Sequence, residues 1–337
     1  MAGVIWIFQN TGPIYSKTSN MSGATTSRYF LGVDGGQSST TALIGDDAGR
    51  VIGMGRGGPC NHVGAAEGRY KFISAIGECI GEASGQAGLN SPTVRFRSAC
   101  LGFSGGPADK EAILREILSA DQMTVTHDGA IALSGATGGK PGIIVIAGTG
   151  SFAFGRNAAD QTARAGGWGY VFGDEGGGFD LARQALRASL RMEEGWGQPT
   201  ILRQKLLHET GAADANDLLH SFYTADFTRP RIAALSKLVD EAAVAGDEVA
   251  RDLLNRAADD LERLVAAVEH QLFRTDEPVE VAYVGGVFGS ATLLGRFLQL
   301  VKDAHPPLYG PAAGALIEAR RAAGFDPKLT GIPATEK

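Results

Sequence analysis

The stretch GIIVIAGTGSFAFGR, residues 142–156, decides the fold of this chain. Its apolar run, residues 143–147, predicts a buried strand that ends in the turn Gly148-Thr149-Gly150-Ser151. A glycine turn at a strand end exposes backbone N–H groups, and the two hydroxyls add small donors, so the turn suits phosphate oxygens. The alternative is an ordinary hairpin turn, although a two-residue hairpin favours Asn-Gly or Asp-Gly. We therefore predict a phosphate-binding turn here.

The same pattern occurs earlier in the chain. Residues 29–33 predict a strand, Asp34-Gly35-Gly36-Gln37-Ser38 a turn, and residues 40–44 and 51–54 two further strands of an antiparallel meander. The two copies lie about 110 residues apart, roughly one domain's length. Two such turns facing each other would hold one polyphosphate from two sides.

Composition limits the classes of function. A chain of 337 residues fits two domains. A net charge of −6 gives no electrostatic footprint for nucleic acid or for an anionic membrane, so neither is expected as a partner. The cysteines, Cys60, Cys79 and Cys100, are widely spaced and odd in number, which argues against a disulfide framework or a metal site made within one chain. We therefore expect a cytoplasmic protein.

The two ends of the chain are expected to lie outside the fold. Residues 1–27 are interpreted as an extension, because the apolar run at residues 4–8 is too short to span a bilayer and no basic residue precedes it. A signal peptide is the alternative. Beyond residue 178 the pattern is mostly helical, with helices expected at 179–192, 200–209, 229–245, 247–273 and 311–323. The tail after Pro327 is expected to be disordered.

Seven motifs, taken in order, resemble those of N-acetylglucosamine kinase and its bacterial relatives, in the BadF/BadG/BcrA/BcrD-type branch of the actin, sugar-kinase and heat-shock-ATPase superfamily. They are Asp34-Gly35-Gly36, Ser104-Gly105-Gly106, Asp128, Gly148-Thr149-Gly150-Ser151, Gly166-Gly167-Trp168-Gly169, Gly173-Asp174-Glu175-Gly176 and Gly285-Gly286-Val287. The match covers residues 29–323, and the series is specific where any one motif alone is weak.

The resemblance implies an α/β fold. It consists of two ribonuclease-H-like domains, each with a mixed five-stranded sheet flanked by helices, with a cleft between them. The expected boundaries are 28–137 plus 311–325 for the first domain and 138–310 for the second, with an extension at 1–27 and a tail at 326–337. ATP and Mg²⁺ are the implied cofactors.

Two aspartates are the main catalytic candidates. Asp34 follows a strand and precedes two glycines; the alternative to a function is an Asx-turn. Since Mg²⁺ is held by one or two carboxylates beside phosphates, the resemblance makes Asp34 the metal ligand. Asp128 lies at a strand-to-helix junction, where an N-cap is the alternative. In the family this aspartate is the general base, and a sugar hydroxyl needs one because its pKa is far above 7.

The residues expected to bind ATP lie in three glycine turns. They are Gly35, Gly36, Gln37 and Ser38 in the first turn, Gly148, Thr149, Gly150 and Ser151 in the second, and Gly285, Gly286 and Val287 after the strand at 279–284. Gln37 stands where a third glycine is often found. It keeps its backbone N–H but restricts positive φ.

The residues expected to bind the sugar are Asn61, Gly105, Asp128, Gly167, Trp168, Gly169, Asp174 and Glu175. Trp168 has the alternative of a core aromatic, and Asp174 and Glu175 that of a solvated turn. Asp174 is the better candidate for direct contact, and Glu175 the better one for bracing the loop. Phe152 stands where N-acetylglucosamine kinase has asparagine, so glucosamine, an N-acetylmuramic-type sugar or another hexose stays open beside N-acetylglucosamine.

The resemblance implies an ATP-dependent sugar kinase that phosphorylates a small-molecule sugar, expected at its 6-hydroxyl. A homodimer stays open. One alternative is an ATPase that activates a dehydratase through a shared iron–sulfur cluster, but the cysteines of such proteins lie late in the chain and none here follows Cys100. The other is a non-catalytic sugar sensor, which the absence of a basic or helix-turn-helix segment before Tyr29 disfavours.

Overall fold

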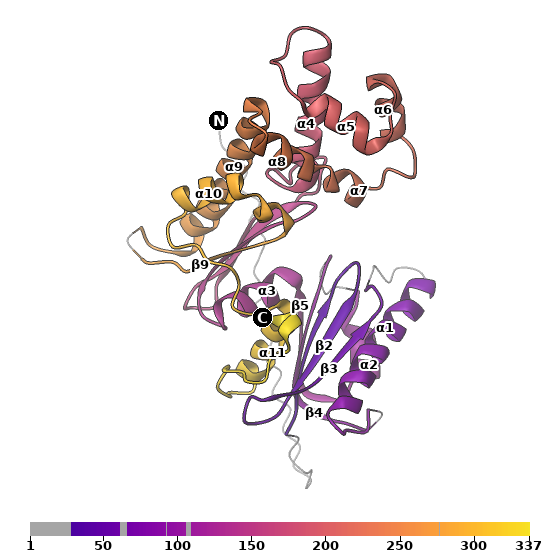
Figure 1. The fold of residues 1–337 in the computed structure, drawn as a ribbon. Helices are drawn as coiled ribbons and strands as arrows, with labels where there is room; N and C mark the ends of the chain where they lie inside the picture. Colours follow the sequence, from indigo (N-terminus) through magenta and orange to yellow (C-terminus); the bar gives the residue numbers. More distant parts are fainter. Residues whose placement is uncertain (1–27, 61–65, 92, 106–108, 276) are drawn as a thin grey trace, which may run out of the picture.

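The computed structural model describes residues 28–60, 66–91, 93–105, 109–275 and 277–337. The expected extension at 1–27 and the candidate Asn61 lie outside these residues. Two mixed sheets with flanking helices make up the described chain (Figure 1). No helix in the described ranges is long and apolar enough to cross a membrane.

The first sheet has the order β3-β2-β1-β4-β5. Its strands are β1 (Phe30–Gly35), β2 (Thr40–Gly45), β3 (Val51–Gly57), β4 (Phe96–Phe103) and β5 (Ala120–His127). The first three run antiparallel, which confirms the predicted meander, and β4 and β5 run parallel to β1. The carboxyl ends of β1, β4 and β5 therefore meet at one edge of this sheet.

The second sheet repeats this arrangement with the order β8-β7-β6-β9. Its strands are β6 (Gly142–Ala147), β7 (Ser151–Arg156), β8 (Thr162–Gly166) and β9 (Val281–Val284). The strands β6 and β7 pair antiparallel and β9 runs parallel to β6, as β4 does to β1. The structure thus confirms the internal repeat predicted from the two glycine turns.

The expectation of five strands in the second sheet is wrong for the described residues. Beside β9, where a fifth strand would lie, the described residues form only a single β-bridge, between His305 and Ala282. His305 N–H donates to the Val281 carbonyl, and the His305 carbonyl accepts from Tyr283 N–H, each at 3.0 Å. Pro306 and Pro307 follow. Because proline has no N–H to donate, the ladder stops there.

Helices cover both sheets (Figure 1). They are α1 (Ala66–Gln86), α2 (Glu111–Ile117), α3 (Asp128–Thr137), α4 (Gly178–Glu193), α5 (Leu202–Thr210), α6 (Ala215–Phe222), α7 (Arg229–Ala234), α8 (Ser236–Val244), α9 (Glu248–Leu272), α10 (Ala291–Leu300) and α11 (Pro311–Ala322), with short 3₁₀ turns η1 (Gly286–Gly289) and η2 (Ala334–Glu336). The single helix expected at 229–245 is two helices, α7 and α8, joined at Leu235.

Alternate residues of β1 are buried on opposite faces of the first sheet. Leu31 and Val33 belong to the core formed with α1, whereas Phe30 belongs to the core formed with α11. Burial on both faces explains why this strand reads as a continuous apolar run. Helix α11 also crosses α3 closely, since a Cβ on Gly314 would lie 1.9 Å from the Ile131 carbonyl oxygen.

The tail is ordered, and the expectation of disorder after Pro327 is wrong. Leu329 and Ile332 are buried beside α11. Thr330 pairs with the start of β3, accepting from Val51 N–H at 2.9 Å. A carboxylate oxygen of Glu336 accepts from Ala313 N–H, in the first turn of α11, at 3.2 Å. Two buried apolar side chains, a bridge to the start of β3 and a hydrogen bond to α11 therefore hold this segment against the first sheet.

We propose that residues 28–137 and 311–337 form one domain and residues 138–310 the other.

Candidate active site

Three polar side chains lie at the carboxyl edge of the first sheet. Asp34 is near the end of β1, Ser104 follows β4, and Asp128 follows β5. These strands are adjacent and parallel, with Asp34 in register with Gly102 and Phe103 with His127. The sheet itself therefore brings together residues that are far apart in the sequence.

Both carboxylate oxygens of Asp128 are held. Ser104 Oγ donates to Oδ2 at 2.8 Å, and Gly129 N–H donates to Oδ1 at 2.8 Å. The N-cap of α3 is His127, so Asp128 is the first residue of the helix and not its cap. An ionised carboxylate has about four acceptor positions, so a substrate hydroxyl can still bind here.

Asp34 is a partly buried carboxylate in an electronegative setting. Burial, with smaller contributions from the negative charges of Glu336 and Asp128, raises its pKa to about 7. In the described part of the chain, no three His, Cys, Asp or Glu side chains come close enough to hold a metal ion. The residues present fit Mg²⁺ held by one protein carboxylate, phosphate oxygens and water, which is the usual way this ion is bound beside a nucleotide.

The first glycine turn is compact. Gly36 N–H donates to the Ser39 carbonyl at 3.0 Å, and its own carbonyl accepts from Cys60 N–H at 2.9 Å. Gln37 and Ser38 are exposed, and Gln37 is not among the residues with positive φ. The turn therefore accommodates Gln37 without strain, and its backbone N–H stays available.

The second glycine turn is joined to the start of α4. Gly178 N–H donates to the Gly148 carbonyl at 2.8 Å, and Phe179 N–H to the Thr149 carbonyl at 3.0 Å. Ser151 is buried and its hydroxyl donates to the Glu175 carbonyl at 2.6 Å. Thr149 is partly exposed. The Ser151 hydroxyl thus braces the following loop, and Thr149 is the better placed of the two hydroxyls for a phosphate.

The third glycine segment adjoins the second turn. Gly285 has φ of +118°, and a Cβ there would lie 2.2 Å from the Ala147 carbonyl oxygen. Only glycine fits this position, which places residues 285–287 against the end of β6. Gly286 is exposed, whereas the Val287 side chain is buried in the core. Any ligand contact of Val287 would therefore come from its backbone.

The loop at residues 166–178, called the sugar loop below, carries the residues expected to contact the sugar. Trp168 is 64% exposed, with Arg164 over its ring at 5.5 Å, so the alternative of a core aromatic is wrong. Asp174 is only 3% exposed and forms an ion pair with Arg229, which contradicts a solvated turn. The Glu175 side chain is exposed, and its carbonyl accepts from Ser151.

The glycines at the remaining positions expected to bind the sugar have positive φ, a backbone conformation that other residues rarely adopt. Gly105 (φ +79°) follows β4 beside Ser104, and Gly167 (φ +71°) and Gly169 (φ +82°) flank Trp168. Gly167 N–H donates to the Ser151 carbonyl at 2.9 Å. This bond ties the sugar loop to the second glycine turn.

Phe152 links the two sheets. It follows the second turn, on β7, and a Cβ on Gly129 would lie 2.9 Å from its ring. The rings of His127 and Phe154 meet edge to face at 4.6 Å. The Asp128 segment of the first sheet therefore contacts the strand that leaves the glycine turn of the second.

Comparison with known proteins identifies the family of this chain. Residues 31–319 match the model of the BadF/BadG/BcrA/BcrD ATPase family. The chain belongs to this family. It is 32% identical to an N-acetylmuramic acid/N-acetylglucosamine kinase of Clostridium acetobutylicum, over 81% of this chain and 91% of that protein. It is 29% identical to an N-acetyl-D-glucosamine kinase of Dictyostelium discoideum, over 80% and 88%.

A solved structure of a provisional N-acetylglucosamine kinase from Chromobacterium violaceum is similar to this BadF/BadG/BcrA/BcrD family member. The TM-score is 0.68 at 30% identity, with 87% of this chain and 99% of that chain covered. The α/β fold expected from the motifs is confirmed.

The sequence did not single out three residues of this family member's site. Ser104 belongs to one of the seven motifs, and its place directly after a strand is a signal for a site residue, but its hydrogen bond to Asp128 does not follow from the motif alone. Arg229, which pairs with Asp174, and Glu336, which lies near Asp34, come from distant segments. No local pattern marks either of them.

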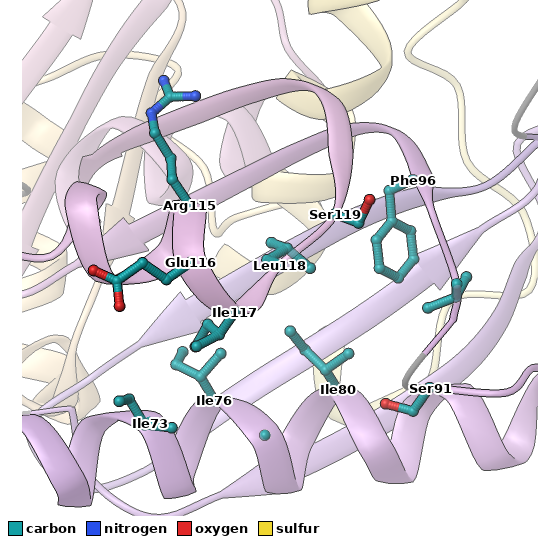
Figure 2. A pocket seen from close by; sticks show the side chains of 12 residues that line it. Ile73, Ile76, Ile80, Ser91, Phe96, Arg115, Glu116, Ile117, Leu118 and Ser119 are labelled. Atoms are coloured by element: carbon teal, nitrogen blue, oxygen red, sulfur yellow. The ribbon is translucent and has the colours of Figure 1, made fainter.

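A cavity of about 480 Å³ lies elsewhere in the first sheet's domain (Figure 2). Ile76 and Ile80 of α1 line it opposite Leu118, which follows α2. None of the predicted site residues lines it. It is therefore separate from the candidate active site.

Proposed function

We propose that this protein is an ATP-dependent amino sugar kinase that transfers the γ-phosphate to a hydroxyl of N-acetylglucosamine, glucosamine or a related sugar. The observation that carries the proposal is the position of Asp128. Its neighbour Gly129 packs against Phe152, the residue directly after the second glycine turn. A fixed carboxylate thus lies close to a turn suited to phosphate, as transfer to a hydroxyl requires.

Asp128 would orient and deprotonate the acceptor hydroxyl. A sugar hydroxyl attacks phosphorus more readily when its proton is accepted as the O–P bond forms, an effect worth about 10²–10⁴-fold. Because Ser104 and Gly129 hold both oxygens, the carboxylate is already oriented before the sugar binds. We propose the 6-hydroxyl as acceptor, since it is the primary and least crowded hydroxyl of a hexose.

The glycine turns would hold the triphosphate. The turns at residues 35–38 and 148–150 lie at the ends of corresponding strands in the two sheets. Because Gly36 N–H and Gly148 N–H donate within their own turns, the N–H groups of residues 37–38 and 149–150 are the donors proposed for the phosphates. Donors fixed there would stabilise the charge that develops on the phosphoryl oxygens. Asp34 would hold Mg²⁺, which when bound neutralises phosphate charge. Residues 285–287 would contact the adenosine.

The sugar would lie between Asp128 and the loop at 166–178. The kinase names of the relatives in Clostridium acetobutylicum and Dictyostelium discoideum support an amino sugar. Trp168, exposed and with Arg164 over its ring, would cover a face of the sugar, and Asp174 would supply a carboxylate acceptor. We include Gly105 and Gly169 in this site through their backbones and Glu175 through its exposed side chain. Gly167, whose N–H donates to Ser151, would hold Trp168 in place.

We infer a cytoplasmic setting, because Cys60, Cys79 and Cys100 are all free and buried. A homodimer stays an open expectation that light scattering can measure. The dehydratase-activator alternative has no support in the sequence, since no cysteine follows Cys100.

The test is release of ADP with N-acetylglucosamine, glucosamine, N-acetylmuramic acid and glucose, each with MgATP. Asp128→Asn should abolish most sugar-stimulated turnover. Asp121→Asn, on the strand β5 that precedes Asp128 and in an exposed ion pair with Arg95, is the matched control and should keep this turnover. Phosphorus NMR of the product would identify the phosphorylated hydroxyl. If no sugar stimulates turnover, or Asp128→Asn stays fully active, the proposal is wrong.

A further inference from the structure

Asp174 is a buried acid in an unusual backbone conformation. Its side chain is 5% exposed and its φ is +66°, which is rare for a residue other than glycine. Burying a carboxylate without a partner costs free energy, so such a side chain tends to turn into solvent or to become protonated. The position of Asp174 therefore depends on the cation that pairs with it.

That cation is Arg229, the first residue of α7. Its Nη2 donates to Oδ2 of Asp174. The same guanidinium lies over the Tyr170 ring at 5.4 Å, so it contacts two points of the sugar loop. Within the described residues its Nε is buried and has no hydrogen-bond partner. Asp174 and Tyr170, and not a full set of hydrogen bonds, therefore hold this guanidinium in place.

The pair also borders the second glycine turn. A Cβ on Gly150 would lie 2.5 Å from Asp174 Oδ2 and 2.7 Å from Arg229 Nη2. The ion pair therefore rests directly on the backbone of that turn. Any shift of the guanidinium would move the sugar loop relative to the turn.

We propose that Arg229 is a positioning residue for sugar phosphorylation: it fixes Asp174 against the Gly150 turn so that the carboxylate meets the sugar in one orientation. This inference rests on the proposed function. Arg229 occupies Oδ2, and Oδ1 makes no hydrogen bond in the described part of the chain, so Oδ1 is the acceptor left for a sugar hydroxyl. Arg229 itself touches neither the sugar nor the phosphates in this scheme.

Arginine and lysine should differ at this position. A lysine keeps the charge but lacks the planar group that lies on Tyr170 while reaching Asp174. Methionine keeps most of the length and removes the charge. Arg229→Lys should therefore retain part of the function, and Arg229→Met very little.

Arg231→Met is a matched control on the same helix. The Arg231 guanidinium lies over Phe227 at 4.3 Å and donates to the Asp226 carbonyl. It thus resembles Arg229 in its aromatic contact but pairs with no carboxylate of the sugar loop. The Arg231→Met variant therefore measures how much the loss of an arginine from α7 changes stability without changing a contact to the sugar loop.

The experiment is steady-state kinetics with the best sugar from the ADP-release screen, with Tm measured for each variant. A hydrogen-bonded charged contact is worth about 1.5–3 kcal/mol, so Arg229→Met should raise the sugar KM about 10- to 100-fold. The KM for ATP should change by less than about threefold, because the turn's own backbone bonds remain. The sugar KM of Arg229→Lys should lie between those of the wild type and Arg229→Met.

A double-mutant cycle completes the test. If Arg229 acts through Asp174, the double variant Asp174→Asn/Arg229→Met should bind sugar no more weakly than Asp174→Asn alone. An active wild type with an unchanged sugar KM in Arg229→Met, or with fully additive losses in the double variant, overturns the role of Arg229. A wild type without sugar-stimulated turnover overturns the proposed function instead.

Discussion

Ser104 Oγ donates a 2.8 Å hydrogen bond to Oδ2 of Asp128, joining the ends of the adjacent parallel strands β4 and β5. Gly129 N–H occupies the other oxygen. The carboxylate plane is therefore set by two groups from different elements. In a base that must meet a hydroxyl at the angle of in-line transfer, orientation matters as much as proton affinity.

Ser104→Ala should lower kcat about tenfold, because the base loses one of the groups that align it. Asp128→Asn should lower kcat about 10²–10⁴-fold. The sugar KM should change little in Ser104→Ala. Ser98→Ala is the control, since Ser98 lies on β4, the strand that precedes Ser104, is buried, and has a hydroxyl with no hydrogen-bond partner in the described chain. Equal losses in the two serine variants would mean that the hydrogen bond to Asp128 does not contribute.

Asp34 should make the ligand-free protein less stable as the pH rises. Burial, together with the nearby charges of Glu336 and Asp128, raises its pKa to about 7 from an ordinary value of 3.8. Because the folded state binds this proton more tightly than the unfolded chain, the stabilisation is fully present below about pH 4 and is lost as the pH rises through about 7.

Asp34→Asn should therefore be more stable than wild type at pH 8, by roughly 1–3 kcal/mol, and the difference should shrink by pH 5.5. The measurement is urea unfolding without nucleotide or metal at both values of pH. Asp47→Asn, in an exposed turn, controls for the loss of an acid. A difference that grows on acidification would contradict the raised pKa. The variant should nevertheless be a poor kinase, since it lacks the carboxylate proposed for Mg²⁺.

Local pattern was enough to predict the ends of strands. The turns at residues 34–38 and 148–151 lie where apolar runs stop, and the structure confirms both hairpins and their repetition. The sequence could not show that the Ser151 hydroxyl donates to the Glu175 carbonyl, because this hydrogen bond forms only when the loop at residues 166–178 folds back onto the turn at residues 148–151. The ion pair between Asp174 and Arg229 joins residues 55 positions apart, so the sequence could not predict it either.

Errors arose where a weak local signal was overridden by packing. The polar, proline-containing tail looked disordered, yet Leu329 and Ile332 find a hydrophobic surface beside α11. The fifth strand of the second sheet was expected from the family resemblance, but Pro306 ends the ladder after His305. In both cases a few side chains outweighed the composition of the segment.

Phe152 should decide which sugars this site accepts. Its ring packs against Gly129, beside the proposed base, and a Cβ on Gly167 of the sugar loop would lie 3.2 Å from Phe152 Cβ. It therefore lies between the two elements that would hold the sugar. A phenyl ring presents no donor or acceptor there, so a substituent that faces it gains apolar contact only.

Phe152→Asn should restore a polar partner and raise kcat/KM for N-acetylglucosamine relative to glucose by about tenfold or more, because a site that hydrogen-bonds a substrate group rejects analogues lacking it. It should also lower stability by about 1–3 kcal/mol, since a partly buried ring is lost. Phe152→Leu is the matched variant: it loses similar packing but gains no polar atom. If both variants leave the ratio of kcat/KM unchanged, or shift it equally, Phe152 contributes packing between the sheets and does not select the sugar.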